Sequence, residues 1–168
     1  MGTGKTAVGK ALAARLRRRL IEVDSVIEKL AGKSIPDIFR QDGEIAFREL
    51  EIQAIKQVAR GRKRVIACGG GVVLNAINIE RLRESGVVVF LTASPSAVLK
   101  RTMAMPGSRP LLDVSDPLAR IRELMKFRRP FYRHAADITI DTTKMDVNPI
   151  ADLITEKLRE YEGFNLKE

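Results

Sequence analysis

The chain opens with Met1-Gly2-Thr3-Gly4-Lys5-Thr6, which matches the end of a phosphate-binding loop of the form G-x-x-x-x-G-K-[ST]. In such a loop, backbone N–H groups and a helix N-terminus hold phosphates, the lysine reaches the β- and γ-phosphates, and the hydroxyl binds Mg²⁺. Glycine suits the loop because a residue without a side chain lets the backbone approach the anion closely. The first glycine of the pattern would lie one residue before Met1, so this sequence holds only the second half of the loop.

Apolar residues follow the loop at helical spacing, at Val8, Leu12 and Leu16. This spacing predicts a helix that begins directly after the glycines. The alternative is a flexible, glycine-containing N-terminus that binds nothing. The helical pattern favours the phosphate loop, because that loop needs a helix N-terminus at this position.

The bulk composition fits one domain over residues 1–168. Hydrophobic residues make up 45% of the chain and charged residues 30%, which is ordinary for a globular protein with a sizeable core. The longest apolar run, 86–91, is far shorter than the roughly 20 residues of a membrane span. The N-terminus has no signal-peptide pattern, and the single Cys68 suits a reducing compartment. We therefore expect a cytoplasmic protein with no membrane partner.

The formal net charge of +9 suits two kinds of partner, nucleic acid or small anions such as nucleotides and carboxylates. Aromatic residues make up only 5% and tryptophan is absent, so a platform for stacking single-stranded bases is not expected. The basic residues are scattered, and the cluster at 61–64 reads as a solvated turn. We expect small anionic ligands and no specific nucleic acid.

Short apolar strands alternate with helical patterns along the rest of the chain. We expect strands at 20–24, 65–68, 86–91 and 138–141, with helices beginning near 25, 34, 44, 75, 94, 116 and 147. This alternation predicts a parallel sheet with helices on both faces. Ligands bind such sheets at the carboxyl ends of the strands, which here carry Asp24, the 69–71 glycine run and Asp141.

A segment rich in proline and glycine breaks the pattern at about 103–115, and we expect it to be a mobile lid. The tail at about 163–168 is expected to be loose.

Phosphoryl transfer needs a phosphate loop, Mg²⁺, cations and a group that orients the acceptor hydroxyl. Asp24 could orient or deprotonate an alcohol, and Arg109 could close over the phosphates and exclude water.

Six pieces of the sequence, in this order, match a known family over nearly the whole chain, which resembles shikimate kinase. The resemblance implies a three-layer α/β/α P-loop kinase fold with a mobile lid and a parallel sheet of strand order 2-3-1-4-5. The first, central strand of that sheet is missing here, so its two neighbours must either leave a gap or pair directly. The matching pieces are Gly2–Thr6, Asp24 within 21–24, Phe47–Glu51, Cys68–Gly71, Arg109–Leu112 and Arg128–Tyr132.

The resemblance also implies an activity, the ATP-dependent phosphorylation of the 3-hydroxyl of shikimate on the route to chorismate and the aromatic amino acids. Its ligands would be shikimate, ATP and Mg²⁺, and the protein would be a monomer. Catalysis would rest on Lys5, Asp24 and Arg109. Glu51 would orient Arg48. Shikimate would contact Asp24, Arg48, Gly70, Gly71 and Arg128. ATP would contact Gly2, Thr3, Gly4, Lys5, Thr6, Ala7, Arg101, Arg109 and Pro149. The metal would be held by Thr6 and by Glu22, which stands where the family usually has aspartate.

Simpler interpretations stay open. Arg48 and Glu51 could be an ordinary surface ion pair on one helix, Asp24 could cap a helix beginning near Ser25, and the glycine run could be a plain turn. Two other functions compete with an active kinase. One is a catalytically weakened binding protein of the same fold, because the first strand and half of the loop are missing. The other, suggested only by net charge, is a nucleic-acid binder.

Overall fold

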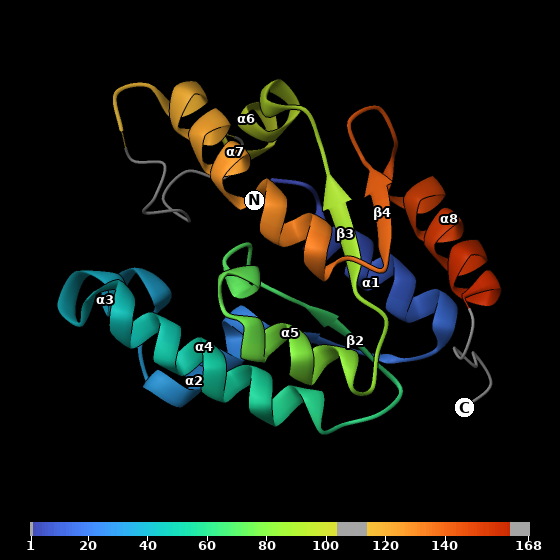
Figure 1. Ribbon diagram of the computed structural model, residues 1–168, viewed down its shortest axis with the longest axis horizontal. Helices are drawn as coiled ribbons and strands as arrows, with labels where there is room; N and C mark the ends of the chain where they lie inside the picture. Colours follow the sequence, from blue (N-terminus) through green and yellow to red (C-terminus); the bar gives the residue numbers. More distant parts are fainter. Residues whose placement is uncertain (1, 104–113, 162–168) are drawn as a thin grey trace.

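A computed structural model of the chain describes residues 2–103 and 114–161 (Figure 1). The predicted lid at about 103–115 falls largely outside these residues, as do Arg109 and the predicted tail. The elements in order are α1 (Lys5–Leu16), β1 (Arg19–Glu22), α2 (Val23–Ala31), α3 (Ile35–Gln41), α4 (Gly43–Ala59), β2 (Arg64–Ala67), the 3-10 helix η1 (Val72–Leu74), α5 (Ala76–Arg83), β3 (Val89–Thr92), α6 (Pro95–Met103), α7 (Pro117–Ala135), β4 (Ile138–Asp141) and α8 (Val147–Glu160).

The strands form two separate parallel pairs. β1 pairs with β2, where Leu20 lies opposite Val65, and β3 pairs with β4, where Leu91 lies opposite Ile140. Among the described residues, β2 and β3 do not pair with each other. Of the two outcomes expected for a missing central strand, the structure therefore has the gap and not the direct pairing.

Each pair of strands has its own apolar core. α2, α4 and α5 pack together beside β1 and β2, around buried residues such as Ile27 and Ile55. α1 and α8 pack together beside β3 and β4, around Leu12, Leu91 and Ile154. The helices cover these strands on both sides, in agreement with the predicted three-layer α/β/α fold.

Two predicted boundaries are wrong. The first strand ends at Glu22, so Asp24 lies in the first turn of α2 and not on the strand, and the helix does not begin near Ser25. Burial explains the early start, because Val23 is completely buried at the beginning of α2. α7 runs through Pro130 to Ala135, and Ala135 is buried at its end.

Side chains cap two other helices. The Ser34 hydroxyl accepts a hydrogen bond from the Asp37 N–H at the start of α3. The Asp116 carboxylate accepts one from the Ala119 N–H, at 2.9 Å, at the start of α7. A cap satisfies an N–H group that the first turn of a helix otherwise leaves unpaired.

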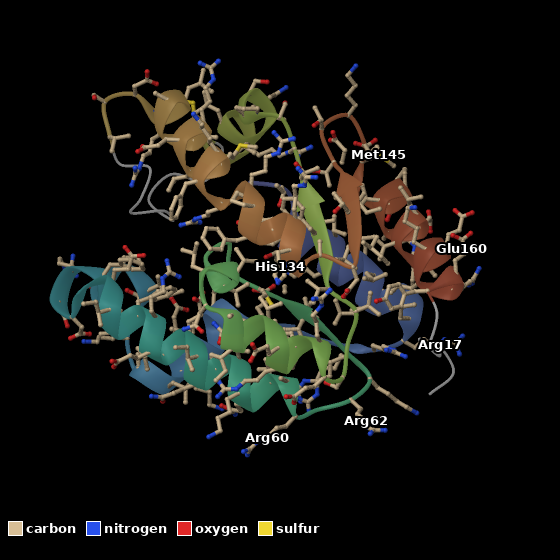
Figure 2. All side chains as sticks on the ribbon, viewed as in Figure 1. Arg17, Arg60, Arg62, His134, Met145 and Glu160 are labelled. Atoms are coloured by element: carbon tan, nitrogen blue, oxygen red, sulfur yellow. The ribbon has the colours of Figure 1, made fainter. Side chains whose placement is uncertain are left out.

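Three of the basic side chains, Arg17, Arg60 and Arg62, are exposed and point away from the body of the protein (Figure 2). This agrees with a solvated turn at 61–64. No helix in 2–103 or 114–161 is long and apolar enough to cross a membrane.

A buried threonine after β4 ties the N-terminal loop to the second pair of strands. The Thr142 hydroxyl lies 3.1 Å from the Thr3 carbonyl oxygen and 3.0 Å from that of Thr92. It also accepts a hydrogen bond from Arg101 Nη1, at 3.1 Å. Thr142 is fully buried, so water cannot take the place of its hydroxyl as a hydrogen-bond partner.

Replacing this hydroxyl should destabilise the fold. Thr142→Val keeps the shape of the side chain but removes the hydroxyl partner of the Thr3 carbonyl oxygen and of Arg101 Nη1, which costs about 1–3 kcal/mol. The free energy of unfolding in urea measures the effect. The matched control is Thr139→Val on the exposed face of β4, which should change stability by less than about 0.5 kcal/mol. Equal losses in the two variants would contradict this role for Thr142.

Candidate functional site

The start of α1 has the form of an anion site. Gly2 and Gly4 have φ angles of 62° and 86°, a left-handed conformation that favours glycine. A Cβ added to Gly2 would lie 2.9 Å from Val98 Cγ1, so the loop is also too close to α6 for a side chain there. The N-cap is Gly4, and the first turn of α1 carries no acidic residue. Its N–H groups and the positive end of the helix dipole are therefore suited to a phosphate.

Arg48 on α4 is held by two carboxylates of its own helix. Its Nη2 donates to Glu44 Oε1 at 2.8 Å, and its Nη1 donates to Glu51 Oε2 at 3.0 Å. The guanidinium also lies 5.0 Å from the centre of the Phe47 ring. With one side fixed by these contacts, the planar group is pre-oriented to pair with a further anion. The predicted Arg48–Glu51 pair is confirmed.

Glu51 is a buried carboxylate beneath the glycine run. Only 1% of its surface is exposed, and burial raises its pKa above the ordinary 4.5, with Arg48 opposing the shift and Asp24 adding to it. A Cβ added to Gly69 would lie 3.3 Å from both Asp24 Oδ1 and Glu51 Oε1. A Cβ on Gly71 would collide with the Arg48 guanidinium. The run is therefore more than a plain turn, because the charged side chains pack directly against its backbone.

α7 contacts the same glycine run from the other side. Arg128 Nη1 donates to the Gly70 carbonyl at 3.2 Å, and the Tyr132 hydroxyl donates to the same oxygen at 2.5 Å. Arg128 is only 7% exposed, and its Nε has no hydrogen-bond partner among the described residues. A buried guanidinium N–H without a partner is costly, so this donor is available for a ligand atom.

The phosphate loop and the charged cluster meet at the carboxyl end of β2. Burial raises the pKa of the Cys68 thiol to about 12. The negative charges of Glu51 and Asp24 add to this increase, and the positive charge of Lys5 opposes it. These three charged groups therefore lie near one thiol. Arg128 lies in the same group, because its charge acts on Glu51. The structure thus brings together the residues predicted for phosphate, for the acceptor hydroxyl and for a carboxylate.

Other predicted ligands lie apart from this cluster. Arg101 donates to the Thr142 carbonyl oxygen at 2.6 Å, which places it behind the phosphate loop. Pro149 is exposed in the first turn of α8. Thr6 and Ala7 are exposed in the first turn of α1.

The oxygen donors predicted for Mg²⁺ are Thr6, at the start of α1, and Glu22, at the end of β1. α1 packs on β1, the strand that ends at Glu22. In 2–103 and 114–161, no group of three or more histidine, cysteine or acidic residues forms a metal site. A hydroxyl and one carboxylate suit Mg²⁺, which is usually held by one or two protein oxygens together with phosphates and water.

Sequence reasoning gave no role to Glu44 or Tyr132. Both lie one helical turn from a predicted arginine, Glu44 four residues before Arg48 and Tyr132 four residues after Arg128. Residues at this spacing are neighbours on a helix surface. That spacing was the available signal for the Glu44–Arg48 contact, whereas the contact of Tyr132 with Gly70 joins distant parts of the sequence and had no local signal.

The fold and the site together define a P-loop kinase. A family model described as shikimate kinase matches residues 1–159. The shikimate kinase of Caldanaerobacter subterraneus subsp. tengcongensis is 47% identical over 161 residues, which cover 96% of this chain and 91% of that protein. The chain belongs to the shikimate kinase family.

Solved structures agree with this assignment. The shikimate kinase from Acinetobacter baumannii in complex with shikimate has 36% identity and a TM-score of 0.92, and the match covers 97% of this chain and 90% of that one. The shikimate kinase from Aquifex aeolicus has 29% identity and a TM-score of 0.78, over 95% and 92% of the two chains. The predicted family and fold class are confirmed.

The raised pKa of Glu51 predicts a pH-dependent stability. The folded state holds this proton more tightly than the unfolded state, so the free energy of unfolding falls as the pH rises from 4.5 through the raised pKa. Glu51→Gln removes this titration. The stability of the parent relative to the variant should therefore decrease over that window and level off above it.

Urea unfolding at several pH values between about 4 and 8 measures this difference. Glu49→Gln is the matched control, because Glu49 is exposed on the same helix, and its difference from the parent should stay flat. A Glu51→Gln difference that is equally flat would contradict the burial of a titrating carboxylate.

Proposed function

We propose that this protein transfers the γ-phosphoryl group of ATP to the 3-hydroxyl of shikimate, which yields shikimate 3-phosphate on the route to chorismate and the aromatic amino acids. The observation that carries the proposal is that Lys5 lines one pocket with Gly69 and Gly70, while Asp24 and Glu51 lie against Gly69 and Glu51 pairs with Arg48. A phosphate site and an acid-binding site are thus adjacent. Family membership supports the same reaction.

At the nucleotide end, the N-terminus of α1 would hold the β- and γ-phosphates, with Gly2, Thr3 and Gly4 leaving their backbone accessible. Lys5 would neutralise the charge that develops during transfer. Thr6 and Glu22 would hold Mg²⁺, which would supply positive charge beside the phosphates. Arg101, Arg109 and Pro149 complete the proposed ATP contacts, and Ala7 would contribute its backbone N–H.

At the acceptor end, shikimate offers one carboxylate and several hydroxyls. Arg48 and the unpaired Nε of Arg128 would bind the carboxylate through charge-assisted hydrogen bonds, which are stronger than neutral ones. The backbone of Gly70 and Gly71 would contact the ring substituents. Arg48 comes from α4 and Arg128 from α7, so the two guanidinium groups would fix the orientation of the ring as well as hold it.

In the transfer step, Asp24 would accept the proton of the 3-hydroxyl as its oxygen bonds to the γ-phosphorus. The bond from that phosphorus to the bridging oxygen breaks at the same time, and ADP leaves with the electron pair. Arg109 would reach the transferring group from the lid and help to exclude water, which is a competing acceptor.

We further propose that the protein works as a cytoplasmic monomer of one domain.

Asp24→Asn tests the catalytic step. The amide cannot accept the proton, so shikimate-dependent ADP release should fall by about 10² or more. Shikimate binding, measured by calorimetry, should persist because the guanidinium contacts remain. The parent should release ADP with shikimate and not with gluconate or nucleoside monophosphates. Near-parental turnover of Asp24→Asn would exclude Asp24 as the base.

Arg48 variants test the carboxylate contact. Arg48→Ala should raise the KM for shikimate more than tenfold with a smaller effect on kcat, because charge-assisted bonds contribute roughly 1.5–3 kcal/mol each. Arg48→Lys keeps a cation beside Glu51 but loses the planar fork, so it should fold and still show a raised KM. Arg40→Ala, an exposed ion-paired arginine on α3, is the control. An unchanged KM in Arg48→Lys would contradict the proposed contact.

The gap between β2 and β3 favours a second candidate, a binding protein of this family with weak catalysis. Such a protein would bind shikimate through Asp24, Arg48 and Arg128 but would hold ATP poorly. Calorimetry with each ligand alone separates the two functions. Shikimate binding without ATP binding or turnover supports the second candidate, whereas binding of both ligands with turnover supports the kinase.

A further inference from the structure

All three nitrogen atoms of the Arg48 guanidinium have a carboxylate acceptor on α4. Nη1 donates to Glu51 Oε2 at 3.0 Å. Nε and Nη2 both donate to a single oxygen, Oε1 of Glu44, at 3.2 and 2.8 Å. The edge of the guanidinium that carries Nε and Nη2 is therefore occupied by Glu44, and we call it the Glu44 edge.

The two carboxylates differ in how easily they can leave Arg48. The Glu51 side chain is only 2% exposed, whereas the Glu44 side chain is 53% exposed. Separating Glu51 from Arg48 would leave a buried carboxylate without its partner, which is strongly destabilising. Glu44 can turn into water at little cost, because exposed ion pairs contribute little to stability. An incoming acid that competes for Arg48 therefore displaces Glu44 and not Glu51.

Other parts of the guanidinium are covered by the protein. A Cβ added to Gly71 would lie 2.3 Å from Nη1 and 2.8 Å from Cζ, so the glycine backbone packs closely against the group. The centre of the Phe47 ring lies 5.0 Å from Cζ, and Glu51 holds Nη1. The Glu44 edge is thus the part of Arg48 that can meet an anion from solvent.

A ligand carboxylate fits the Glu44 edge better than Glu44 itself does. Glu44 offers one oxygen to both nitrogens, whereas a free carboxylate can offer both oxygens in two parallel hydrogen bonds, the strong geometry of arginine–carboxylate pairs. Glu44 is also tethered to the same helix, four residues before Arg48, which restricts how it can approach. An acid that makes further contacts in the site can therefore replace it.

We propose that Glu44 is a placeholder for the carboxylate of the substrate. It occupies the Glu44 edge while the site is empty and turns into solvent when the acid binds. It keeps the guanidinium paired in the empty site, and it lowers the affinity for every acid that uses this edge by one common factor, because only molecules with Glu44 displaced can bind. This inference rests on the proposed function, since it names a residue that sets the affinity for shikimate.

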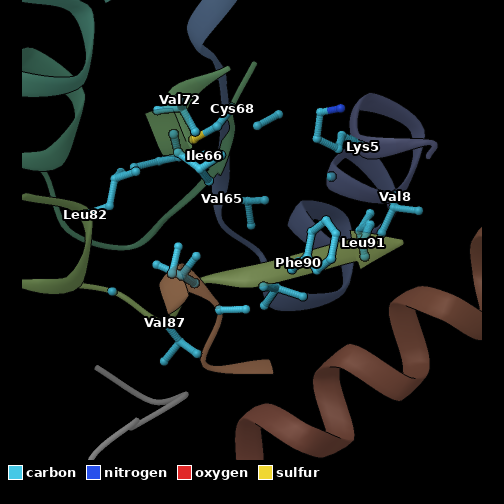
Figure 3. A pocket seen from close by; sticks show the side chains of 18 of the residues that line it. Lys5, Val8, Val65, Ile66, Cys68, Val72, Leu82, Val87, Phe90 and Leu91 are labelled. Atoms are coloured by element: carbon cyan, nitrogen blue, oxygen red, sulfur yellow. The ribbon is translucent and has the colours of Figure 1, made fainter. Parts of the chain in front are cut away.

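The nucleotide end of the site provides an internal control. Lys5 and Cys68 line a pocket (Figure 3) whose described lining residues include neither Glu44 nor Arg48. A ligand held by Lys5 does not use the Glu44 edge. The affinity for ATP should therefore be independent of Glu44, whereas a general change in the charge of the site would alter it as well.

Glu44→Gln tests the placeholder. The amide keeps the shape of the side chain but carries no charge, so it holds Arg48 more weakly. We expect the Kd and the KM for shikimate to fall by about two- to fivefold, with kcat within about twofold of the parent and the Kd for ATP unchanged. A KM for shikimate that is unchanged or raised would overturn the proposal, because a group that only orients Arg48 gives that result.

Two matched variants separate the contact from the charge. Glu49→Gln removes the same charge from an exposed position of α4 and should leave the KM for shikimate unchanged. Glu44→Asp keeps the charge in the first turn of α4 but withdraws the carboxylate by one methylene, so it should lower the KM as Glu44→Gln does. An equal fall in Glu49→Gln, or no fall in Glu44→Asp, would show an effect of charge alone and contradict the placeholder.

NMR of protein labelled with ¹⁵N at arginine follows the contact without turnover. The Arg48 Nε–H resonance is identified by its absence from Arg48→Lys. We expect it to differ between the parent and Glu44→Gln without ligand and to coincide in the two at saturating shikimate, because Glu44 has then left Arg48. A difference that persists at saturation would show that Glu44 stays in place, and it would overturn the proposal.

The same measurements distinguish the two proposals from each other. If neither the parent nor Glu44→Gln binds shikimate, the proposed function fails and the placeholder fails with it. If the parent binds and phosphorylates shikimate but the Glu44 variants bind it no more tightly, the placeholder alone is wrong.

Discussion

Two helices hold the two halves of the protein in position. α1 packs on β1 and β2 along one part of its surface and on α8 along another, so it belongs to both cores. α7 packs on α6 and reaches η1 and the glycine run. β2 and β3 are not paired with each other among the described residues, and these helices and side-chain contacts connect the two pairs of strands. The site lies where α7 meets the glycine run, and Lys5 at the start of α1 lines the same pocket.

The same arrangement explains the burial of charge at the site. Glu51 is almost fully buried, and its burial is tolerated because Arg48 pairs with it and Arg128 lies near. A buried carboxylate without such partners would be strongly destabilising. The cations that stabilise Glu51 are also those proposed to bind the substrate acid. A ligand carboxylate would therefore compete with Glu51 and Glu44 for the same two guanidinium groups.

Much of the fold followed from local patterns. Apolar periodicity located the helices and strands, and β4 agrees with the expected range because turn residues bound it on both sides. The start of α2 did not follow, since the burial of Val23 depends on packing against α4. Helix spacing predicted the Arg48–Glu51 pair. The contact of Tyr132 with Gly70 joins residues 62 apart in the sequence, and no local pattern encodes that distance.

Tyr132 has a consequence for how the two halves communicate. Its ring stacks on Phe90 of β3, with centroids 4.4 Å apart, while its hydroxyl holds the Gly70 carbonyl that follows β2. One rigid aromatic side chain therefore spans the boundary between the sheets. Any shift of one half against the other must tilt this ring, stretch its hydrogen bond, or carry Gly70 along. The position of the Gly70 backbone therefore depends on the spacing between the two pairs of strands. A change in that spacing would also change the geometry of the proposed acid-binding site.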